Sequence, residues 1–196
     1  MKQEVSFMYT GRKIILEQPT EADAAILQKW YLNKAFRHWY DSYVSVSLDM
    51  IQEEIRSGKS ITDPSATRVD FIVRNKRNNE PIGVASIKDI DRQNGHAEIA
   101  LGIADEDKRL AGFGVDLMIV LCDIVFYEFG FEKCYTKVND DNDLGLRSAL
   151  SFGFIGEGKL RKHIFVDGQY VDQWILGMQR DEYEKLDIVP RWKSRK

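Results

Sequence analysis

The spacing of hydrophobic and polar positions changes along the chain, and each change predicts a different element. A short apolar run at residues 13–17 predicts a strand, which Pro19 ends. Thr20, followed by Asp23 three positions later, is typical of a helix start, so we expect a helix that continues to about Asn33. The first ten residues show no such pattern and are expected to be irregular.

A second helix and an antiparallel meander are expected next. Ser47 precedes residues 48–57, which we expect to be helical, and Gly58 supplies the stop. Three stretches separated by polar turns follow, and they predict strands at 68–74, 81–90 and 96–104.

The C-terminal half combines helices with strands. Gly112 and Gly114 open an apolar stretch with helical spacing, and Gly130 ends it. The other expected elements are a strand at 133–138, a helix at 142–152 and a hairpin of 154–165 with 170–178 around Asp167-Gly168. This order predicts an α+β fold with a mixed, mostly antiparallel central sheet of about seven strands, flanked by helices.

The bulk composition narrows the classes of function. The 196 residues, 43% of them hydrophobic, suffice for one domain whose core needs no disulfide or metal. We divide the chain into an N-terminal extension (1–11), a domain (12–186) and a basic tail (187–196). A net charge of −3 without a polybasic patch argues against a nucleic-acid partner. Because no apolar run approaches about 18 residues and no signal peptide opens the chain, we expect a cytoplasmic protein without membrane contact.

The cysteines and histidines form no pattern of a metal or redox site. Cys122 and Cys134 stand apart without a CxxC pair, so we expect both to be reduced and packed. The three histidines, His38, His96 and His163, show no ligand spacing with carboxylates, and no metal is expected.

The most informative stretch is Arg109-Leu110-Ala111-Gly112-Phe113-Gly114, between an expected strand and an expected helix. Glycines let the backbone fold tightly, so that its N–H groups and the helix N-terminus form a site for a pyrophosphate. Lys108 and Arg109 are close enough in sequence to add positive charge. A glycine pair is also compatible with a plain strand-to-helix turn. The dinucleotide fingerprint GxGxxG is absent, since position 117 is Leu, and the P-loop motif GxxxxGK[ST] does not occur in the sequence.

A resemblance to a known family adds to this interpretation. Arg109-x-x-Gly112-x-Gly114 resembles the Q/R-x-x-G-x-G/A acetyl-CoA signature of the GNAT acetyltransferases. The further segments similar to that family are the strand 97–104, the helix from Asn142 to Gly153-Phe154, and the hairpin turn 167–172, which is similar to the RimJ/RimL and spermidine acetyltransferase branch.

This resemblance implies a GNAT fold, a twisted sheet whose fourth and fifth strands splay apart, and direct acetyl transfer from acetyl-CoA to an amine. The residues that it places at acetyl-CoA are Leu101, Gly102, Ile103, Lys108, Arg109, Leu110, Ala111, Gly112, Phe113, Gly114, Val115, Asn142 and Arg147. Arg147 is either a phosphate contact or a residue of the helix surface. The family also implies a homodimer.

Glu98 is the candidate general base, because it interrupts an otherwise apolar strand and a glutamate there has this role in several relatives. The alternative is a solvent-facing strand residue. Relatives often carry a tyrosine as general acid where this chain has Ala149. Ser148, Ser151, a tyrosine elsewhere, or no acid would then replace it.

The acceptor amine is expected at an aromatic loop, residues 36–43. His38, Trp39, Tyr40 and Asp41 are the candidate substrate-binding residues, because aromatic faces and carboxylates attract ammonium groups. The alternative is that the aromatic residues fix this loop to the core. The expected substrate is a small primary amine, such as a polyamine, an amino sugar or an amino acid. A protein N-terminus, or a degenerate domain that only binds acyl-CoA, remain as alternatives.

Overall fold

The computed structural model describes residues 8–41, 44–109, 111–166 and 168–187. Its strands are β1 (Met8–Thr10), β2 (Ile14–Glu17), β3 (Val69–Asn75), β4 (Pro81–Asp91), β5 (His96–Ile103), β6 (Lys133–Asn139), β7 (Ile155–Val166) and β8 (Gln169–Gln179). The hydrogen-bonded order is β1-β2-β3-β4-β5-β6-β8-β7, with β5 and β6 parallel. The expected mixed, mostly antiparallel sheet is confirmed.

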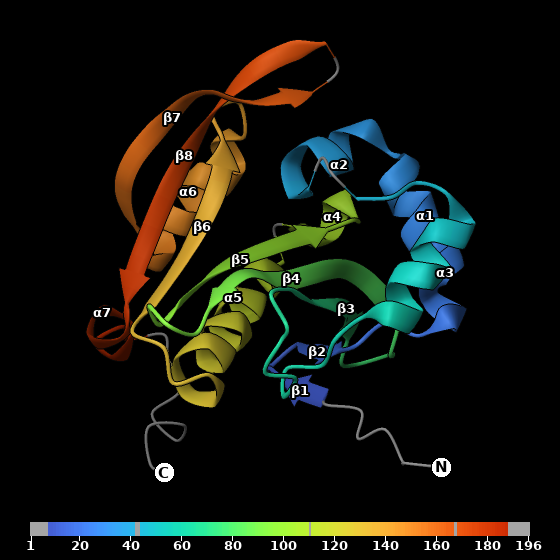
Figure 1. The fold of residues 1–196 in the computed structure, drawn as a ribbon, viewed down its shortest axis with the longest axis horizontal. Helices are drawn as coiled ribbons and strands as arrows, with labels where there is room; N and C mark the ends of the chain where they lie inside the picture. The colour runs from blue at the N-terminus through green and yellow to red at the C-terminus, as the bar shows by residue number, and fades with distance from the viewer. Residues whose placement is uncertain (1–7, 42–43, 110, 167, 188–196) are drawn as a thin grey trace. The chain divides into compact units, whose positions relative to one another are not determined.

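Helices lie in several of the connections between these strands (Figure 1). They are α1 (Ala24–Leu32), α2 (Lys34–Tyr40), α3 (Leu48–Ser57), α4 (Glu106–Arg109), α5 (Phe113–Asp123), α6 (Asp143–Phe152) and α7 (Arg180–Glu184), with a 3₁₀ turn at Glu21–Asp23. None of the helices within the described ranges is long and apolar enough to cross a membrane.

The chain divides into two compact units, the first of which comprises the residues up to 88 and residues 100–120. In this unit α1, α2 and α3 cover one face of β3 and β4 (Figure 1). The shared core consists of Ala24, Leu27, Tyr31, Phe36, Tyr40, Ile51, Ile72, Val84 and Ala100. The predicted helix start is confirmed, since the backbone N–H of Thr20 donates to Asp23 Oδ2 at 2.9 Å.

Helix α2 occupies most of the segment that the sequence predicted as a loop, residues 36–43, so that prediction is wrong for residues 36–40. The helix begins because the Asn33 side chain accepts a hydrogen bond from the Phe36 backbone N–H at 3.2 Å. Phe36 and Tyr40, four positions apart, lie on one helix face and are both buried. Residues 42 and 43 lie outside the described ranges.

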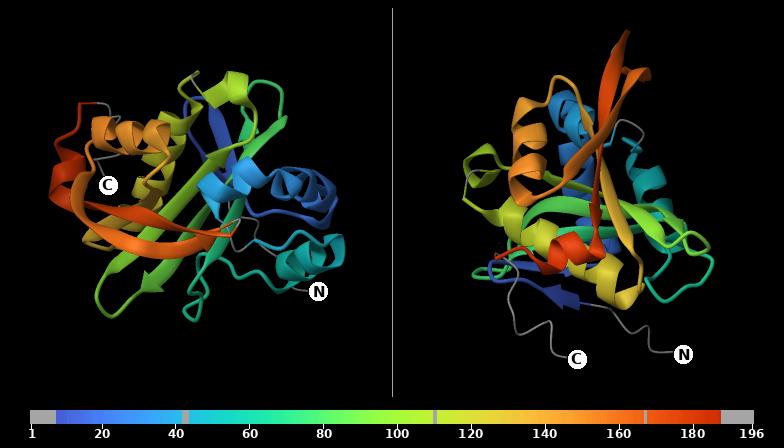
Figure 2. Two further views of the ribbon diagram at one scale, coloured as in Figure 1. Left: turned by 90° about the horizontal axis from the view of Figure 1, so that it is seen from above. Right: turned by 90° about the vertical axis from the view of Figure 1, so that its left-hand side faces the viewer.

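The second unit comprises residues 89–99 and the residues from 121 onward. Strand β6 pairs antiparallel with β8, and the long β7–β8 hairpin follows, with α6 beside β6 and β8 (Figure 2). The hairpin turn has Gly168 at a φ of +83°, which glycine adopts without steric cost. Asp167 lies outside the described residues.

The parallel ladder between β5 and β6 begins both strands. Its registered pairs are His96 with Lys133, Ala97 with Cys134 and Glu98 with Tyr135. The divergence of the two strands beyond this ladder stays a prediction of the family resemblance.

Helix α5 departs from the regular helix that the sequence predicted up to Phe129. Residues Ile124–Glu128 form a π-helical turn, in which the Phe129 N–H donates to the Ile124 carbonyl five positions earlier at 3.0 Å. Gly130 ends the helix at a φ of +70°, as the sequence predicted.

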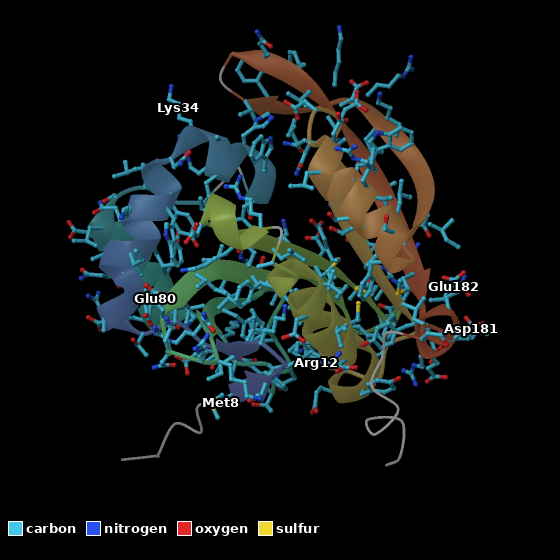
Figure 3. All side chains as sticks on the ribbon, turned by 180° about the vertical axis from the view of Figure 1, so that it is seen from behind. Met8, Arg12, Lys34, Glu80, Asp181 and Glu182 are labelled. Atoms are coloured by element: carbon cyan, nitrogen blue, oxygen red, sulfur yellow. The ribbon has the colours of Figure 1, made fainter. Side chains whose placement is uncertain are left out.

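Two terminal elements were not predicted. Strand β1 forms within the first ten residues, which were expected to be irregular, because Met8 pairs with Glu17 of β2 (Figure 3). Helix α7 begins at Arg180, where Gln179 and Glu182 form a capping box. The pairing of β1 depends on a folded neighbour, which a short apolar pattern does not reveal. The capping box of α7 is a local signal between residues three positions apart, and it was missed.

Candidate functional site

The glycine turn before α5 exposes a set of backbone donors. At the start of α5, the Asp116 N–H donates to the Gly112 carbonyl at 3.3 Å. The first N–H groups of a helix have no carbonyl partner within the helix, and in α5 these are the groups of Phe113, Gly114 and Val115. Donors at a helix N-terminus, together with the helix dipole, form a site for an anion. Leu110, which the sequence placed in this turn, lies outside the described residues.

The glycines of the turn fit a ligand that approaches the backbone closely. Gly112 has a φ of +78°, a conformation that other residues rarely adopt. A Cβ atom built on Gly114 would meet no atom of the described residues within 4 Å, so open space lies beside its N–H group. The backbone donors and this space fit a pyrophosphate of the kind that acetyl-CoA carries.

Lys13, which sequence analysis did not identify, reaches this turn from the beginning of β2. Its Nζ donates to the Ala111 carbonyl at 2.6 Å, across 98 positions of the chain. The same ammonium lies 5.8 Å from the centroid of the Phe113 ring and 3.3 Å from where a Cβ of Gly112 would stand. No sequence pattern signals this contact, because only the folded sheet brings residue 13 to the turn.

Asp116, in the first turn of α5, holds residues 12–14, where the chain enters β2. Figure 3 labels Arg12, the first of these residues. The buried carboxylate of Asp116 accepts backbone N–H groups from Arg12 at 3.0 Å, Lys13 at 2.7 Å and Ile14 at 3.1 Å. A Cβ on Gly11 would stand 2.4 Å from Asp116 Oδ2, so this close approach requires glycine. The carboxylate thus fixes β2 against the helix that follows the glycine turn.

Arg109 and Lys108 direct their side chains to partners in the chain. The Arg109 Nε donates to the Ile103 carbonyl at 3.0 Å, and its guanidinium lies 5.5 Å from the centroid of the Trp39 ring. The Lys108 ammonium forms an ion pair with Glu80 at 3.3 Å. The structure therefore gives the two predicted cationic residues of the turn defined protein partners.

The predicted pantetheine strand, Leu101 to Ile103, forms the C-terminal end of β5. A Cβ on Gly102 would stand 2.9 Å from the Phe36 ring, so α2 packs against this strand at its glycine. The Gly102 carbonyl in turn approaches Gly83 so closely that only glycine fits there. Pairing of this strand with pantetheine stays a prediction.

Glu98, the predicted base, lies on β5 and is only 3% exposed. The alternative of a solvent-facing position is therefore wrong. Its Oε2 lies 2.8 Å from the ammonium of Lys137 on β6, which also forms an ion pair with Asp89 at 3.3 Å. Sequence analysis missed Lys137, because the pairing of two strands far apart in sequence creates the contact.

Two opposing effects act on the protons of this cluster. Burial disfavours the charge of Lys137, but hydrogen bonds and attraction to Glu98 and Asp89 outweigh it and raise the pKa of Lys137. Burial and the negative charges of Asp89 and Glu98 raise the pKa of Tyr135. The Tyr135 hydroxyl lies 3.3 Å from Asp89 Oδ2. Both Lys137 and Tyr135 therefore hold their protons near neutral pH.

The two residues predicted from α6 have mainly local contacts. Asn142 is the N-cap, and its Oδ1 accepts from the Gly145 N–H at 2.9 Å. Arg147 is exposed, and its Nε lies 3.3 Å from the Asp143 carbonyl. This placement fits the helix-surface alternative. Ala149 is buried and offers no acid.

The predicted acceptor residues on α2 divide into buried and exposed ones. Tyr40 is buried and lies 3.3 Å from Ser86 Oγ, and burial raises the pKa of its hydroxyl. Trp39 is 44% exposed and His38 is half-buried. The alternative that the aromatic residues fix this segment to the core holds for Phe36 and Tyr40, and acceptor binding by Trp39 stays a prediction.

Asp41, the fourth predicted acceptor residue, is buried and bound to cations of the chain. Its Oδ2 lies 2.9 Å from Arg68 and 3.6 Å from Lys88. A substrate ammonium would have to compete with Arg68 and Lys88 for the Asp41 carboxylate. The two ion pairs instead hold Asp41, and with it the end of α2, in place.

The cysteines lie in the core as free thiols, as the sequence predicted. Burial, together with the neighbouring Cys134, raises the pKa of the Cys122 thiol well above its ordinary value. Among the residues that the structure describes, no cluster of three or more histidine, cysteine or acidic side chains could hold a metal ion.

Comparison with known proteins identifies the family of the chain. Residues 13–155 match the family described as "Acetyltransferase (GNAT) domain". The SPbeta prophage-derived uncharacterized N-acetyltransferase YokL of Bacillus subtilis is 34% identical over 54% of this chain, and the match spans 59% of that protein. The uncharacterized N-acetyltransferase p20 of Bacillus licheniformis is 27% identical over 90% of this chain and 97% of its own.

Solved structures share the fold at low sequence identity. A probable acetyltransferase has a TM-score of 0.78 and 18% identity, covering 90% of this chain and 98% of its own. The spermidine N-acetyltransferase from Vibrio cholerae, in complex with CoA and spermine, has a TM-score of 0.76 and 20% identity, covering 88% of this chain and 99% of its own.

Proposed function

The chain belongs to the GNAT acetyltransferase family, and from this premise we propose that it transfers an acetyl group from acetyl-CoA to the primary amine of a small molecule. The observation that carries this proposal is the row of N–H donors at Phe113, Gly114 and Val115, which follows the positive-φ turn at Gly112. A helix start with this geometry binds the pyrophosphate of a CoA thioester without a metal.

Acetyl-CoA supplies the acetyl group as a thioester. The N–H donors before α5 would hold its pyrophosphate, and the backbone of Leu101 to Ile103 would pair with the pantetheine arm as an added strand. These contacts would orient the thioester, which supplies much of the catalysis when two reactants must meet.

Glu98 is the proposed general base. An amine attacks only with a free electron pair, so a proton must leave the substrate nitrogen. The substrate ammonium first gives this proton to the Glu98 carboxylate, and the free amine then attacks the thioester carbonyl. As the N–C bond forms and the C–S bond breaks, the electron pair of the C–S bond leaves with sulfur, and the second proton of the nitrogen passes to the departing thiolate or to solvent. Lys137, 2.8 Å from Glu98, would keep the carboxylate in position, and therefore acts as a positioning residue.

A small cationic acceptor is favoured by two observations. The ring of Trp39 is exposed at the end of α2, and aromatic rings attract ammonium groups. Several solved structures with the same fold are spermidine N-acetyltransferases, and one of them contains CoA and spermine. We therefore place polyamines first among the acceptors, ahead of amino sugars, amino acids and protein N-termini.

The test is acetyl-CoA-dependent thiol release against polyamines, amino sugars, amino acids and short peptides. Turnover of a polyamine with loss of about 100- to 10,000-fold in Glu98→Gln supports the proposal. Glu157→Gln is the matched control, because Glu157 also pairs with a lysine, at 2.7 Å, but on the partly exposed β7. Turnover of peptides alone would contradict a small-molecule acceptor and indicate a protein N-terminus instead. CoA binding without turnover of any amine would indicate a domain that binds acyl-CoA without catalysis.

We also propose a cytoplasmic homodimer. The hydrogen-bonding order leaves β7 at one end of the sheet, and exposed edge strands pair readily with other strands. Light scattering that gives the mass of one chain would contradict the dimer.

A further inference from the structure

Lys13 has more donors than the protein uses. A lysine ammonium carries three N–H donors. Among the residues that the structure describes, this ammonium donates one hydrogen bond, to the Ala111 carbonyl at 2.6 Å. Among these residues it forms no ion pair with a carboxylate, so its positive charge is available for an anion.

The ammonium lies at the turn whose backbone donors are proposed to bind the cosubstrate. It contacts the residue before Gly112, and it lies 5.8 Å from the centroid of the Phe113 ring. Phe113 is also the first residue of α5, where the helix dipole is positive. The lysine ammonium is repelled by the positive end of the helix dipole. An anion that binds between the ammonium and the backbone N–H groups attracts both, which makes this arrangement of charges favourable.

The main chain of Lys13 is fixed on both sides. Its N–H donates to Asp116 Oδ2 at 2.7 Å, and its carbonyl accepts from the Lys76 N–H at 2.8 Å. Asp116 belongs to the same helix α5 that begins at the turn. Only the side chain must therefore become ordered when a ligand binds, which lowers the entropic cost of the contact.

The cationic residues in the family signature do not fill this place. Arg109 donates through Nε to the Ile103 carbonyl at 3.0 Å and lies over the Trp39 ring. Lys108 forms an ion pair with Glu80 at 3.3 Å. Among the described residues, Lys13 is a cation beside the turn that forms no ion pair with a carboxylate.

We propose that Lys13 is a cosubstrate-binding residue whose ammonium contacts the pyrophosphate of acetyl-CoA held by the N–H groups of Phe113 to Val115. This inference rests on the proposed function, because it needs a CoA thioester at the turn. Arg109 and Lys108 direct their positive charges to other partners, and Lys13 supplies the charge at the turn. It does so from a position 98 residues before Ala111 in the sequence.

The test measures CoA binding by titration calorimetry, without an amine, for the full chain and for Lys13→Met, which keeps the aliphatic stem. Dephospho-CoA, which lacks the 3′-phosphate but keeps the pyrophosphate, is the second ligand. We expect Lys13→Met to weaken both ligands by the same factor, about 10- to 100-fold, as for the loss of a charged hydrogen bond. Lys13→Arg should recover most of the affinity, and added salt should reduce the difference.

Lys59→Met is the matched control. Lys59 is exposed and also donates to a backbone carbonyl, that of Ser65 at 3.2 Å, but it lies in the loop after α3. Its loss should leave both affinities unchanged. Equal thermal midpoints for the three variants and the parent would show that folding is retained.

Three results would overturn the inference. Unchanged binding of both ligands by Lys13→Met would show that the lysine only links β2 to Ala111. A loss confined to CoA would place the contact at the 3′-phosphate. Failure of the unaltered protein to bind CoA would overturn the proposed function itself, and it is distinguished from the other two because it appears before any substitution.

Discussion

Replacement of Asp116 by alanine tests how strongly one carboxylate holds β2 to α5. The side chain is 6% exposed and accepts three backbone N–H groups, from Arg12, Lys13 and Ile14. Hydrogen bonds to a charged group contribute about 1.5–3 kcal/mol each, but water can replace part of this near the surface. The Ile14 bond is buried, so its N–H would lose its partner without replacement, at a cost of about 1–3 kcal/mol.

We therefore expect Asp116→Ala to lower the free energy of unfolding by about 3–5 kcal/mol, a large part of the roughly 5–15 kcal/mol of an ordinary domain. Asp116→Asn keeps one acceptor oxygen but places an NH₂ group against the remaining donors. Its expected loss is smaller, about 1–3 kcal/mol. Gly11→Ala should also destabilise the protein, because the new Cβ would stand 2.4 Å from a carboxylate oxygen that its donors hold in place.

The assay is equilibrium unfolding in urea, with the slope m compared between variants. Asp63→Ala is the control, because Asp63 accepts from the Ser65 N–H at 2.8 Å in an exposed turn. The reasoning is refuted if Asp116→Ala loses less than about 1 kcal/mol, or no more than the control, because the three hydrogen bonds would then contribute little.

Four further outcomes follow from other contacts. Because burial raises the pKa of Cys122, neither cysteine should react with a thiol reagent until the protein unfolds, and a fast-reacting thiol in the native protein would contradict this. Tyr183→Phe removes a 2.8 Å hydrogen bond to a buried carboxylate and should cost about 1–2 kcal/mol in urea unfolding. The pKa of Tyr183 is raised in the folded state, so its stabilising effect is complete below about pH 10 and is lost at higher pH, which unfolding at alkaline pH would measure. A double-mutant cycle of Arg109→Met and Trp39→Ala should give a coupling of about 0.5–1 kcal/mol, and additive losses would exclude the contact.

The parts of the fold that the sequence predicts depend on local chemistry. The Thr20 capping box, the helix stop at Gly130 and the hairpin turn at Gly168 each involve residues a few positions apart, so their signals are present in the sequence itself. The glycine turn before α5 is recognisable for the same reason. Its backbone conformation at Gly112 depends on residues within one short stretch.

The missed features depend on contacts between distant segments. Helix α2 was predicted as a loop because its aromatic residues fit either state, and the Asn33 cap with a core-facing Phe36 decides between them. Glu98 was correctly singled out, but its burial beside Lys137 follows from the pairing of β5 with β6. The three hydrogen bonds that Asp116 accepts from residues 12–14 have no signal in the sequence.

The hydrogen bonds from Arg12, Lys13 and Ile14 to Asp116 join residues 102 to 104 positions apart. A growing chain leaves the ribosome from its N-terminus, so this closure must wait until more than half of the polypeptide has been made. Closing so long a loop also costs more chain entropy than forming a hairpin or a helix. We therefore place it after local elements that are made earlier, such as the helices α1 and α3. A chain shortened from its C-terminal side to before residue 116 would release the beginning of β2 together with the loss of the turn that it supports.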